Sequence, residues 1–340
     1  MSKSKRIFLI SDSKDYTDKL LLTDIRKRAK GFIRLGHDVQ VFSPNLAIRL
    51  LGGITHKLWV YKVYKPKMDE LIVRQIRNYC PDIVYLSFAK YLDLETISRI
   101  REAASGAVLV GYDVDIFPEQ HSGRVLAASG LDLLLTTYAG HALVPYENKG
   151  VRCIFLPNVC DPDIEYRYPV SAEWESGILF TGRIVHRNYP TDEMRCQLLS
   201  RLLADTRFVY YGPKGRRMIG GIDYYYAISG AKIGLSINAD NNIPLYHSDR
   251  LTHYLACGTM VVAKKVPDSE KLFIDKRHLR YFDSVEEFFD LADWYLDHEQ
   301  ERLAIANEGM EYVHREFSCE KIAKYTLDAI EMGTYSAPWC

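Results

Sequence analysis

The strongest constraint on the fold is an alternation of short apolar runs with amphipathic segments, which occurs twice along the chain. Six apolar runs in the first half have the length and composition of buried strands, at residues 6–10, 37–43, 82–88, 107–113, 131–137 and 151–157. After a stretch that contains Pro162 and Pro169, the pattern restarts with four runs, at residues 177–182, 207–212, 232–238 and 259–265. Strands that alternate with helices form parallel sheets with helices on both faces. The sequence therefore predicts an α/β chain of two doubly wound, Rossmann-like domains facing a central cleft.

The proline-containing stretch sets the expected domain boundary. We expect a first domain over residues 1–165 and a second over residues 172–318. The last helix, predicted at about residues 319–332, is expected to cross back, so that residues 319–340 join the first domain. In doubly wound sheets, ligands bind beyond the carboxyl ends of the strands. The chemistry is therefore expected in the loops that follow strands.

Charge is distributed unevenly along a chain that is neutral as a whole. Residues 1–110 hold 20 Lys and Arg against 11 Asp and Glu, whereas the remainder holds 24 and 33. A basic first domain suggests an anionic partner, such as a phosphate-bearing or lipid-linked acceptor, a glycan, a membrane surface or a nucleic acid, although a solvated basic face explains the counts equally well. The basic candidates are Arg26, Lys27, Arg28, Lys30, Arg34, Lys57, Lys62, Lys65 and Lys67.

The cysteines and the apolar runs exclude several classes of protein. The seven cysteines are scattered without a CxxC pair, which indicates reduced thiols rather than a disulfide framework or a zinc site. No run approaches the roughly 20 apolar residues of a membrane span, and the run at residues 7–10 is too short for a signal peptide. We expect a cytoplasmic protein, with peripheral membrane contact left open.

Three residues after the first strand of the second domain form the first candidate site. These are Gly182, Arg183 and Arg187. Glycine lets a phosphate approach the backbone, and arginine offers a planar, permanently charged fork of donors. A diphosphate between two guanidinium groups is the simplest functional interpretation, and two solvated loop arginines are the structural alternative.

A second candidate is the helix predicted from "SDRLTHYLACG". Ser248 is a plausible N-cap, and Arg250 and His253 share one face of the helix. A helix N-terminus carries about +0.5 charge and unpaired N–H groups, which suit a phosphate. An ordinary amphipathic helix with a hydrogen-bonded His253 explains the same spacing.

Candidate general bases lie in the first domain. Asp113 closes the run 107–113, Asp115 follows two residues later, and His121 comes shortly after. A carboxylate or an imidazole at this edge could deprotonate an acceptor hydroxyl, and an Asp-x-Asp pair could hold a divalent cation. Acidic residues are also common in turns, so a structural role is the simpler interpretation.

The ordered set of segments in the second half resembles the donor domain of GT-B glycosyltransferases. The segments are "GILFTGRIVHRN", "RCQLLSRLLADTRFVYYG", "KIGLSIN" and "SDRLTHYLACGTMVVAKK". The similarity is greatest to the group-1, GT4-like branch that includes the spore-maturation CgeB-like proteins. In the first half, "RLGHDVQVF", "PDIVYLSF" and "VLVGYDVD" resemble successive segments of the same family. The resemblance covers nearly the whole chain.

The resemblance implies that the second domain binds a nucleotide-diphosphate sugar and the first domain binds the acceptor. By position, Arg183 and Arg187 would grip the donor diphosphate, and Ser248 and Arg250 would lie near the phosphates. The residues implied near the nucleotide base are Tyr211, Gly212 and Pro213. No cofactor and no metal are expected, because arginines neutralise the diphosphate. The implied activity is transfer of a hexosyl or related sugar to an acceptor hydroxyl, in bacterial-type glycan or glycoconjugate synthesis.

Two positions depart from the family pattern. Relatives carry glutamate where this chain has His253, at the contact with the donor ribose, and often a second glutamate where it has Leu245. The departures leave the donor, the stereochemical outcome and the activity itself open. Three alternatives follow: a transferase that modifies a nucleic-acid base, a nucleotide-sugar epimerase, and a catalytically silent protein that binds a nucleotide sugar.

Overall fold

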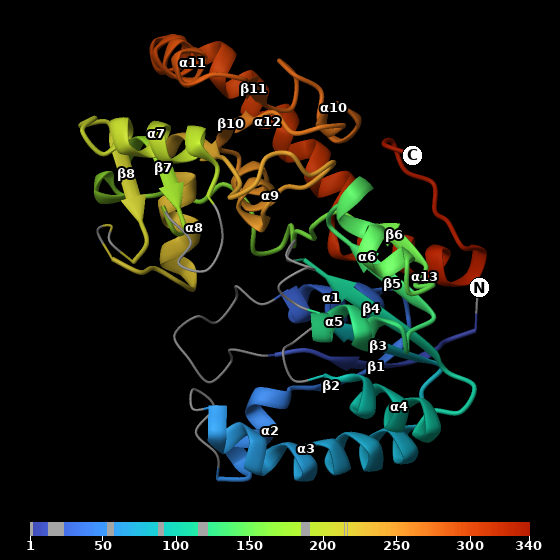
Figure 1. Cartoon of the computed structure of the whole chain (residues 1–340). Coiled ribbons are helices and arrows are strands. Elements are labelled where there is room, and N and C mark those ends of the chain that lie inside the picture. The colour runs from blue at the N-terminus through green and yellow to red at the C-terminus, as the bar shows by residue number, and fades with distance from the viewer. Residues whose placement is uncertain are drawn as a thin grey trace. The chain divides into compact units, whose positions relative to one another are not determined.

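The chain divides into two compact units, each built around one parallel sheet (Figure 1). The computed structural model describes residues 3–12, 24–52, 58–87, 92–114, 122–184, 191–213, 215 and 217–340. Unit 1 comprises Met1–Pro157 and Ile322–Tyr335, and unit 2 comprises Asn158–Lys321 and Ser336–Cys340. The proline-containing stretch, which was expected to be a linker, belongs to unit 2 from Asn158 onward, so the boundary lies earlier than residue 165. The final five residues belong to unit 2 as well.

Unit 1 contains a six-stranded parallel sheet in the order β2-β1-β3-β4-β5-β6. Its elements are β1 (Arg6–Ile10), α1 (Asp24–Arg34), β2 (Asp38–Phe42), α2 (Pro44–Leu50), α3 (Leu58–Tyr79), β3 (Ile83–Ser87), α4 (Leu94–Ala103), β4 (Val108–Asp113), α5 (Ser122–Ala128), β5 (Leu133–Thr136), η2 (Gly140–Leu143), α6 (Val144–Glu147) and β6 (Cys153–Phe155). All six strands lie in runs that the sequence predicts as strands.

Along each strand of this sheet, successive side chains point to opposite faces. Val84 and Leu86 of β3 join a core that includes apolar residues of α3 and α4. Tyr85 points to the other face, where its ring lies 6.1 Å from that of Phe32 on α1. The alternation explains why β3 is an unbroken apolar run, because both of its faces are buried.

Two helices of unit 1 depart from the sequence-based expectation. Helix α2 was not expected; it begins after Ser43, whose side chain accepts a hydrogen bond from the backbone N–H of Leu46, and Pro44 occupies the first turn. Helix α3 begins at Leu58 and contains Pro66, whereas the sequence shows a clear helical pattern only in "LIVRQIRNY", residues 71–79. The proline and the neighbouring lysines interrupt the apolar period that sequence reasoning relies on.

Unit 2 contains a five-stranded parallel sheet in the order β11-β10-β9-β7-β8. Its elements are η3 (Ala172–Trp174), β7 (Ser176–Thr181), α7 (Glu193–Leu202), β8 (Phe208–Tyr211), α8 (Ile222–Ser229), β9 (Ala231–Ser236), α9 (Asp249–Ala256), β10 (Met260–Lys264), α10 (Ser269–Leu272), β11 (Arg280–Phe282), α11 (Val285–Asp297) and α12 (Glu299–Glu316). Helix α13 (Cys319–Met332) begins in unit 2 and continues in unit 1. Strand β11 was not expected from the sequence.

Helices cover both faces of the second sheet. One core contains Leu198 and Leu199 of α7 together with Phe180 of β7 and Phe288 of α11. On the opposite face, α9 lies so close to β9 that a Cβ on Gly234 would come within 2.3 Å of the ring of Tyr254. The Tyr254 hydroxyl accepts a 2.9 Å hydrogen bond from the backbone N–H of Thr181, and this contact fixes α9 against the end of β7.

Candidate functional site

The strand order of unit 2 locates the candidate site. Strand β7 lies between β8 and β9, so the chain leaves β7 toward one side of the sheet and returns on the other. Ligands of doubly wound sheets bind outside the carboxyl ends of the strands at such a point, where the strand order reverses. The carboxyl ends of β7 and β9 lie at Thr181 and Ser236. The residues that follow them are therefore the first to consider.

The turn after β7 requires glycine at position 182. Gly182 has a φ of 130°, and a Cβ there would lie 2.9 Å from Nη1 of Arg250. Its N–H donates a 3.0 Å hydrogen bond to the carbonyl of Tyr211, and its own carbonyl accepts one of 2.9 Å from the hydroxyl of Tyr210. A Cβ on Gly212 would come within 2.0 Å of the Gly182 carbonyl oxygen. The structure thus brings together four of the expected donor residues, Gly182, Tyr211, Gly212 and Arg250.

Arg250, on the first turn of α9, reaches back to the ends of both strands. Its Nη1 donates to the carbonyl of Thr181 at 2.6 Å, and its Nη2 donates to the carbonyl of Ile237 at 2.9 Å. Its guanidinium lies 4.4 Å from the centre of the Phe180 ring, a distance at which a cation is attracted to an aromatic face. The sequence-based expectation placed Arg250 near phosphates, and the observed contacts are with backbone carbonyls at the same edge of the sheet.

A second guanidinium, that of Arg195 on α7, occupies the same edge. It donates through Nη1 to Ile237, through Nη2 to Arg183 and through Nε to Ile184, in each case to the backbone carbonyl. Arg195 is only 3% exposed. Burial, and next the positive charge of Arg250, lower the pKa of Arg195 to about 9. Within the described residues, neither Arg195 nor Arg250 has a carboxylate oxygen within 4.0 Å.

Sequence reasoning missed Arg195, although its spacing carries a signal. Arg195 shares the buried face of α7 with Leu198, Leu199 and Leu202, at the intervals expected for one side of a helix. A charged side chain among apolar positions on the core face needs a specific partner. That pattern distinguishes Arg195 from Arg201, which lies on the same helix and is exposed.

The remaining expected donor residues lie in different environments. Arg183 and Pro213 are exposed, and Arg187 lies outside the described residues. Ser248 precedes α9, but its side chain makes no capping hydrogen bond, and its Oγ is buried without a hydrogen-bond partner in the described part of the chain. The Ser248 N–H donates to Oδ1 of Asn238 at 3.3 Å, which attaches the start of α9 to the segment after β9.

His253 lies in a polar cluster with Tyr224 and Glu165. Its Nδ1 lies 3.1 Å from the Tyr224 hydroxyl, and its Nε2 lies 3.4 Å from Oε1 of Glu165. Glu165 is completely buried and also accepts a 2.6 Å hydrogen bond from the backbone N–H of Asp161. Sequence reasoning missed Glu165, because it lies in the stretch expected to be a linker. The chain therefore has a buried carboxylate beside the position where relatives are expected to carry glutamate.

Of the candidate general bases in unit 1, only Asp113 lies within the described residues; Asp115 and His121 fall outside them. Asp113 is 2% exposed and pairs through Oδ1 with Nη1 of Arg124 at 2.8 Å. Its Oδ2 accepts hydrogen bonds from the hydroxyls of Tyr138 at 3.0 Å and Tyr146 at 2.7 Å. A carboxylate with three donors holds adjacent segments of unit 1 together and is poorly placed to take a proton from a substrate.

The basic residues of α1 are not all available to a partner. Lys27 and Arg28 are buried, contrary to the expectation of a shared basic face, and Lys57 lies outside the described residues. The Arg28 guanidinium pairs with Asp24 at 2.6 Å and lies 3.6 Å from the centre of the Tyr112 ring. These two cations belong to the interior of unit 1, because α1 turns that side toward the sheet.

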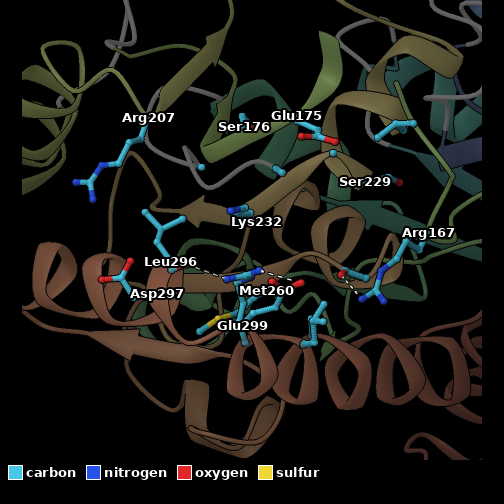
Figure 2. Close-up of a pocket in the computed structure, with 18 residues that line it drawn as sticks. Arg167, Glu175, Ser176, Arg207, Ser229, Lys232, Met260, Leu296, Asp297 and Glu299 are labelled. Atoms are coloured by element: carbon cyan, nitrogen blue, oxygen red, sulfur yellow. Dashed lines mark hydrogen bonds and ion pairs between the residues drawn. The ribbon is translucent and has the colours of Figure 1, made fainter. Parts of the chain in front are cut away.

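A pocket of about 670 Å³ lies at the opposite end of the unit 2 strands (Figure 2). Its lining includes Ser176 and Gly177 at the start of β7, Ala231 at the start of β9 and Met260 at the start of β10. In Figure 2, Lys232 lies between two pairs of residues, with Glu175 and Ser176 on one side and Met260 and Glu299 on the other. None of the expected donor residues lines this pocket, so it is separate from the candidate site.

The fold is shared with several solved structures. Sucrose-phosphate synthase from Thermosynechococcus elongatus superposes with a TM-score of 0.65 at 13% identity, covering 96% of this chain and 98% of that one. Anabaena Alr3699/HepE, solved in complex with UDP and glucose, superposes with a TM-score of 0.63 at 14% identity, covering 96% and 100%. This chain has the GT-B fold. A putative UDP-N-acetylglucosamine 2-epimerase from Listeria monocytogenes is also similar, with a TM-score of 0.56 at 10% identity and 97% of each chain covered.

Comparison of the sequence with family models gives one match. Residues 191–328 match the family model described as glycosyl transferase-like. Comparison of the sequence with curated proteins gives no significant match. The narrower resemblance to CgeB-like proteins stays a prediction. Among the described residues, no helix has the length and apolar character to cross a membrane, and no cluster of three or more His, Cys, Asp or Glu side chains is arranged to hold a metal ion.

Proposed function

We propose that this GT-B chain is a glycosyltransferase, which moves a sugar from a nucleotide-diphosphate donor to an acceptor hydroxyl. The observation that carries the proposal is the pair of guanidinium groups at the carboxyl ends of β7 and β9, which has no ion-pair partner among the described residues. A positive centre whose guanidinium groups form no ion pair among the described residues, at the point where the strand order reverses, suits a bound anion. HepE, of the same fold, has been solved with UDP and with UDP-glucose.

The chemical role of the site is electrostatic. When the bond between the sugar and the diphosphate breaks, negative charge grows on the leaving diphosphate. The field of Arg195 and Arg250, the exposed guanidinium of Arg183 and the N-terminus of α9 all favour that charge. Removing one donor of this kind typically slows turnover by a factor on the order of 100 to 1,000.

The proposal also covers the donor ribose and the acceptor. His253 has both ring nitrogens engaged, with Tyr224 and Glu165, so the ribose contact that relatives make with glutamate requires a different group in this chain. We place the acceptor on unit 1, with a hydroxyl of a glycan, of a lipid-linked sugar or of another anionic molecule as the nucleophile. Asp115 and His121 stay candidates for the general base.

No metal or organic cofactor is part of the proposal, since guanidinium groups supply the positive charge. Unchanged turnover in EDTA is the expected result. Loss of turnover in EDTA, restored by Mg²⁺ or Mn²⁺, would return the Asp113 and Asp115 pair to consideration as metal ligands.

The proposal is tested by thermal unfolding in the presence of UDP, GDP, dTDP, ADP and the matching nucleotide sugars. A ligand at 100 times its Kd stabilises the native state by about 2.7 kcal/mol, so one nucleotide series is expected to raise the unfolding temperature. Transfer of radiolabelled sugar to acceptor extracts then separates the alternatives. An epimerase converts the nucleotide sugar without an acceptor, and a silent binding protein leaves it intact. No stabilisation by any of these nucleotides would contradict the proposal.

A further inference from the structure

The loop after β7 and the end of β9 are held together by one buried side chain. At the carboxyl ends of parallel strands, carbonyl groups pass beyond the last ladder hydrogen bond and need other donors. The carbonyls of Arg183, Ile184 and Ile237 are in this position, and the Arg195 guanidinium donates to all three. A single planar fork thus connects the end of one strand to the end of its neighbour.

The position of Arg195 is itself set by rigid parts of unit 2. Its backbone N–H donates to Oδ1 of the N-cap residue Asp192 at 3.2 Å, which fixes the first turn of α7. Its guanidinium lies 5.3 Å from the centre of the Phe180 ring, and Leu198 and Leu199 anchor the next turn of α7 in the core. The Arg195 side chain therefore has little freedom to follow a loop that moves.

We propose that Arg195 is a positioning residue of the donor site, which holds Gly182–Ile184 and the end of β9 in the geometry that receives the diphosphate. This inference rests on the proposed function. At 3% exposure the Arg195 side chain is too deeply buried to contact a nucleotide directly, so it acts through the residues that it holds. Arg183, whose carbonyl it fixes, carries the exposed guanidinium that meets the diphosphate.

The geometry makes a specific demand on the side chain at position 195. Three carbonyls in different directions require the planar fork of arginine, whose five N–H donors have fixed angles. Lysine concentrates its donors at one atom, and burial lowers the pKa of an ammonium group more readily than it removes the charge of a guanidinium group. Arg195→Lys therefore tests the planar fork with the side chain closest to arginine in size and chemistry.

Arg302 provides a matched control in the same unit. It is 4% exposed, and its Nη1 donates to the carbonyls of Tyr295 at 2.6 Å and Leu296 at 3.4 Å, at the end of α11. Burial lowers its pKa, as it does for Arg195. Arg302 lines the pocket at the opposite ends of the strands, so Arg302→Lys loses comparable contacts away from the donor site.

The first measurement is amide hydrogen exchange on the full chain without ligand, for the parent protein, Arg195→Lys and Arg302→Lys. We expect peptides that cover residues 181–184 and 237–241 to exchange at least tenfold faster in Arg195→Lys and at the parent rate in Arg302→Lys. Parent-like exchange of these peptides in Arg195→Lys would overturn the inference. If Arg195→Lys does not fold, Arg195→Gln, which keeps one amide donor, takes its place.

The second measurement is calorimetric titration with UDP, or with whichever nucleoside diphosphate the parent protein binds. Affinity is expected to fall at least tenfold in Arg195→Lys and to change less than twofold in Arg302→Lys. Equal losses in the two variants would show general softening of unit 2 and overturn the inference. If the parent protein binds none of the nucleotides, the proposed function fails and the donor-site role of Arg195 fails with it. The hydrogen-exchange measurement then still decides whether Arg195 holds residues 182–184 in place.

Discussion

Arg195 and Arg250 donate hydrogen bonds to the same acceptor, the backbone carbonyl of Ile237, although they come from two different helices. Each also donates to a carbonyl at or just after the end of β7. Burial, and next the repulsion between the two like charges, lower the pKa of Arg195. The two side chains therefore join neighbouring strand ends while they concentrate positive charge there, and a bound diphosphate would relieve the repulsion.

Two arginines of the candidate site are expected to respond differently to removal. Arg183→Ala should weaken nucleoside-diphosphate binding about tenfold or more with little change in unfolding temperature, because the side chain is exposed. Arg250→Ala should weaken binding and also lower the free energy of unfolding by about 1–3 kcal/mol, because the carbonyls of Thr181 and Ile237 lose a donor. Calorimetric titration and urea unfolding measure the two effects. Nucleotide binding by Arg183→Ala at the parent affinity would remove it from the site.

Gly182→Ala is expected to damage the site through the backbone. A φ of 130° is strained for any residue with a Cβ, and the added methyl would meet Nη1 of Arg250 at 2.9 Å. We expect a loss of about 1–3 kcal/mol in unfolding free energy together with weaker nucleotide binding. Gly150→Ala is the control, because Gly150 also has a positive φ but has no atom within 4 Å of the added Cβ. Similar nucleotide affinity in both variants would show that the contact with Arg250 is unimportant.

Acid is expected to destabilise unit 2 through two buried histidines. Burial lowers the pKa of His247 to about 4, and burial and the charge of Arg277 lower that of His278 to about 4. The unfolded chain takes up these protons near pH 6.5, before the folded chain does, so stability falls as the pH drops from about 6.5 toward 4. For His247 the loss amounts to about 3 kcal/mol.

The surroundings of the two histidine rings show which substitution tests this pH dependence. His278 accepts a hydrogen bond at Nδ1 from the N–H of Ile274, at 3.2 Å, which a protonated ring cannot do. The His247 ring packs at 5.9 Å from that of Phe273, and a phenyl ring can take its place. Urea unfolding between pH 7.5 and 4.5 should show a flatter profile for His247→Phe than for the parent. The same slope in both would contradict the assignment.

Placing at position 253 the glutamate that the resemblance implies is expected to be harmful in this chain. The new carboxylate would lie beside Glu165, which is completely buried 3.4 Å from the present His253 ring. Two buried carboxylates cannot both ionise at low cost, so one keeps its proton and its folded pKa is raised. The stability of His253→Glu should therefore fall as the pH rises above about 4.3.

A second substitution tests the cause of this effect. Glu165→Gln removes one of the two charges and should recover most of the lost stability in the double variant, as measured by urea unfolding at pH 8. His253→Gln serves as the uncharged control. Parent-like stability of His253→Glu at pH 8 would show that the two side chains do not share an environment.

Much of the fold could be predicted from the sequence, because strands buried on both faces are unbroken apolar runs. All six strands of unit 1 lie within the predicted runs, and four of the five in unit 2 match them to within one residue. Strand β11 was not predicted because it has only three residues. The first part of helix α3 was not predicted because Pro66 interrupts its apolar period. Gly182 and Arg250 were candidates because of their positions after a strand and at a helix start, and Tyr211 and Gly212 were implied by the resemblance; the structure brings these four residues together.

By itself, the sequence determined the two parallel sheets and the edge at which the candidate site lies, since apolar periodicity and turn residues are local properties. Only the tertiary structure decided which charged side chains are buried at that edge. Arg195 and Glu165 occupy segments that look like an ordinary helix and a linker, and Lys27 and Arg28 look like part of a solvated basic face. Whether a charge meets water, a carbonyl or another charge depends on segments distant in sequence, and that is information that spacing along the chain does not carry.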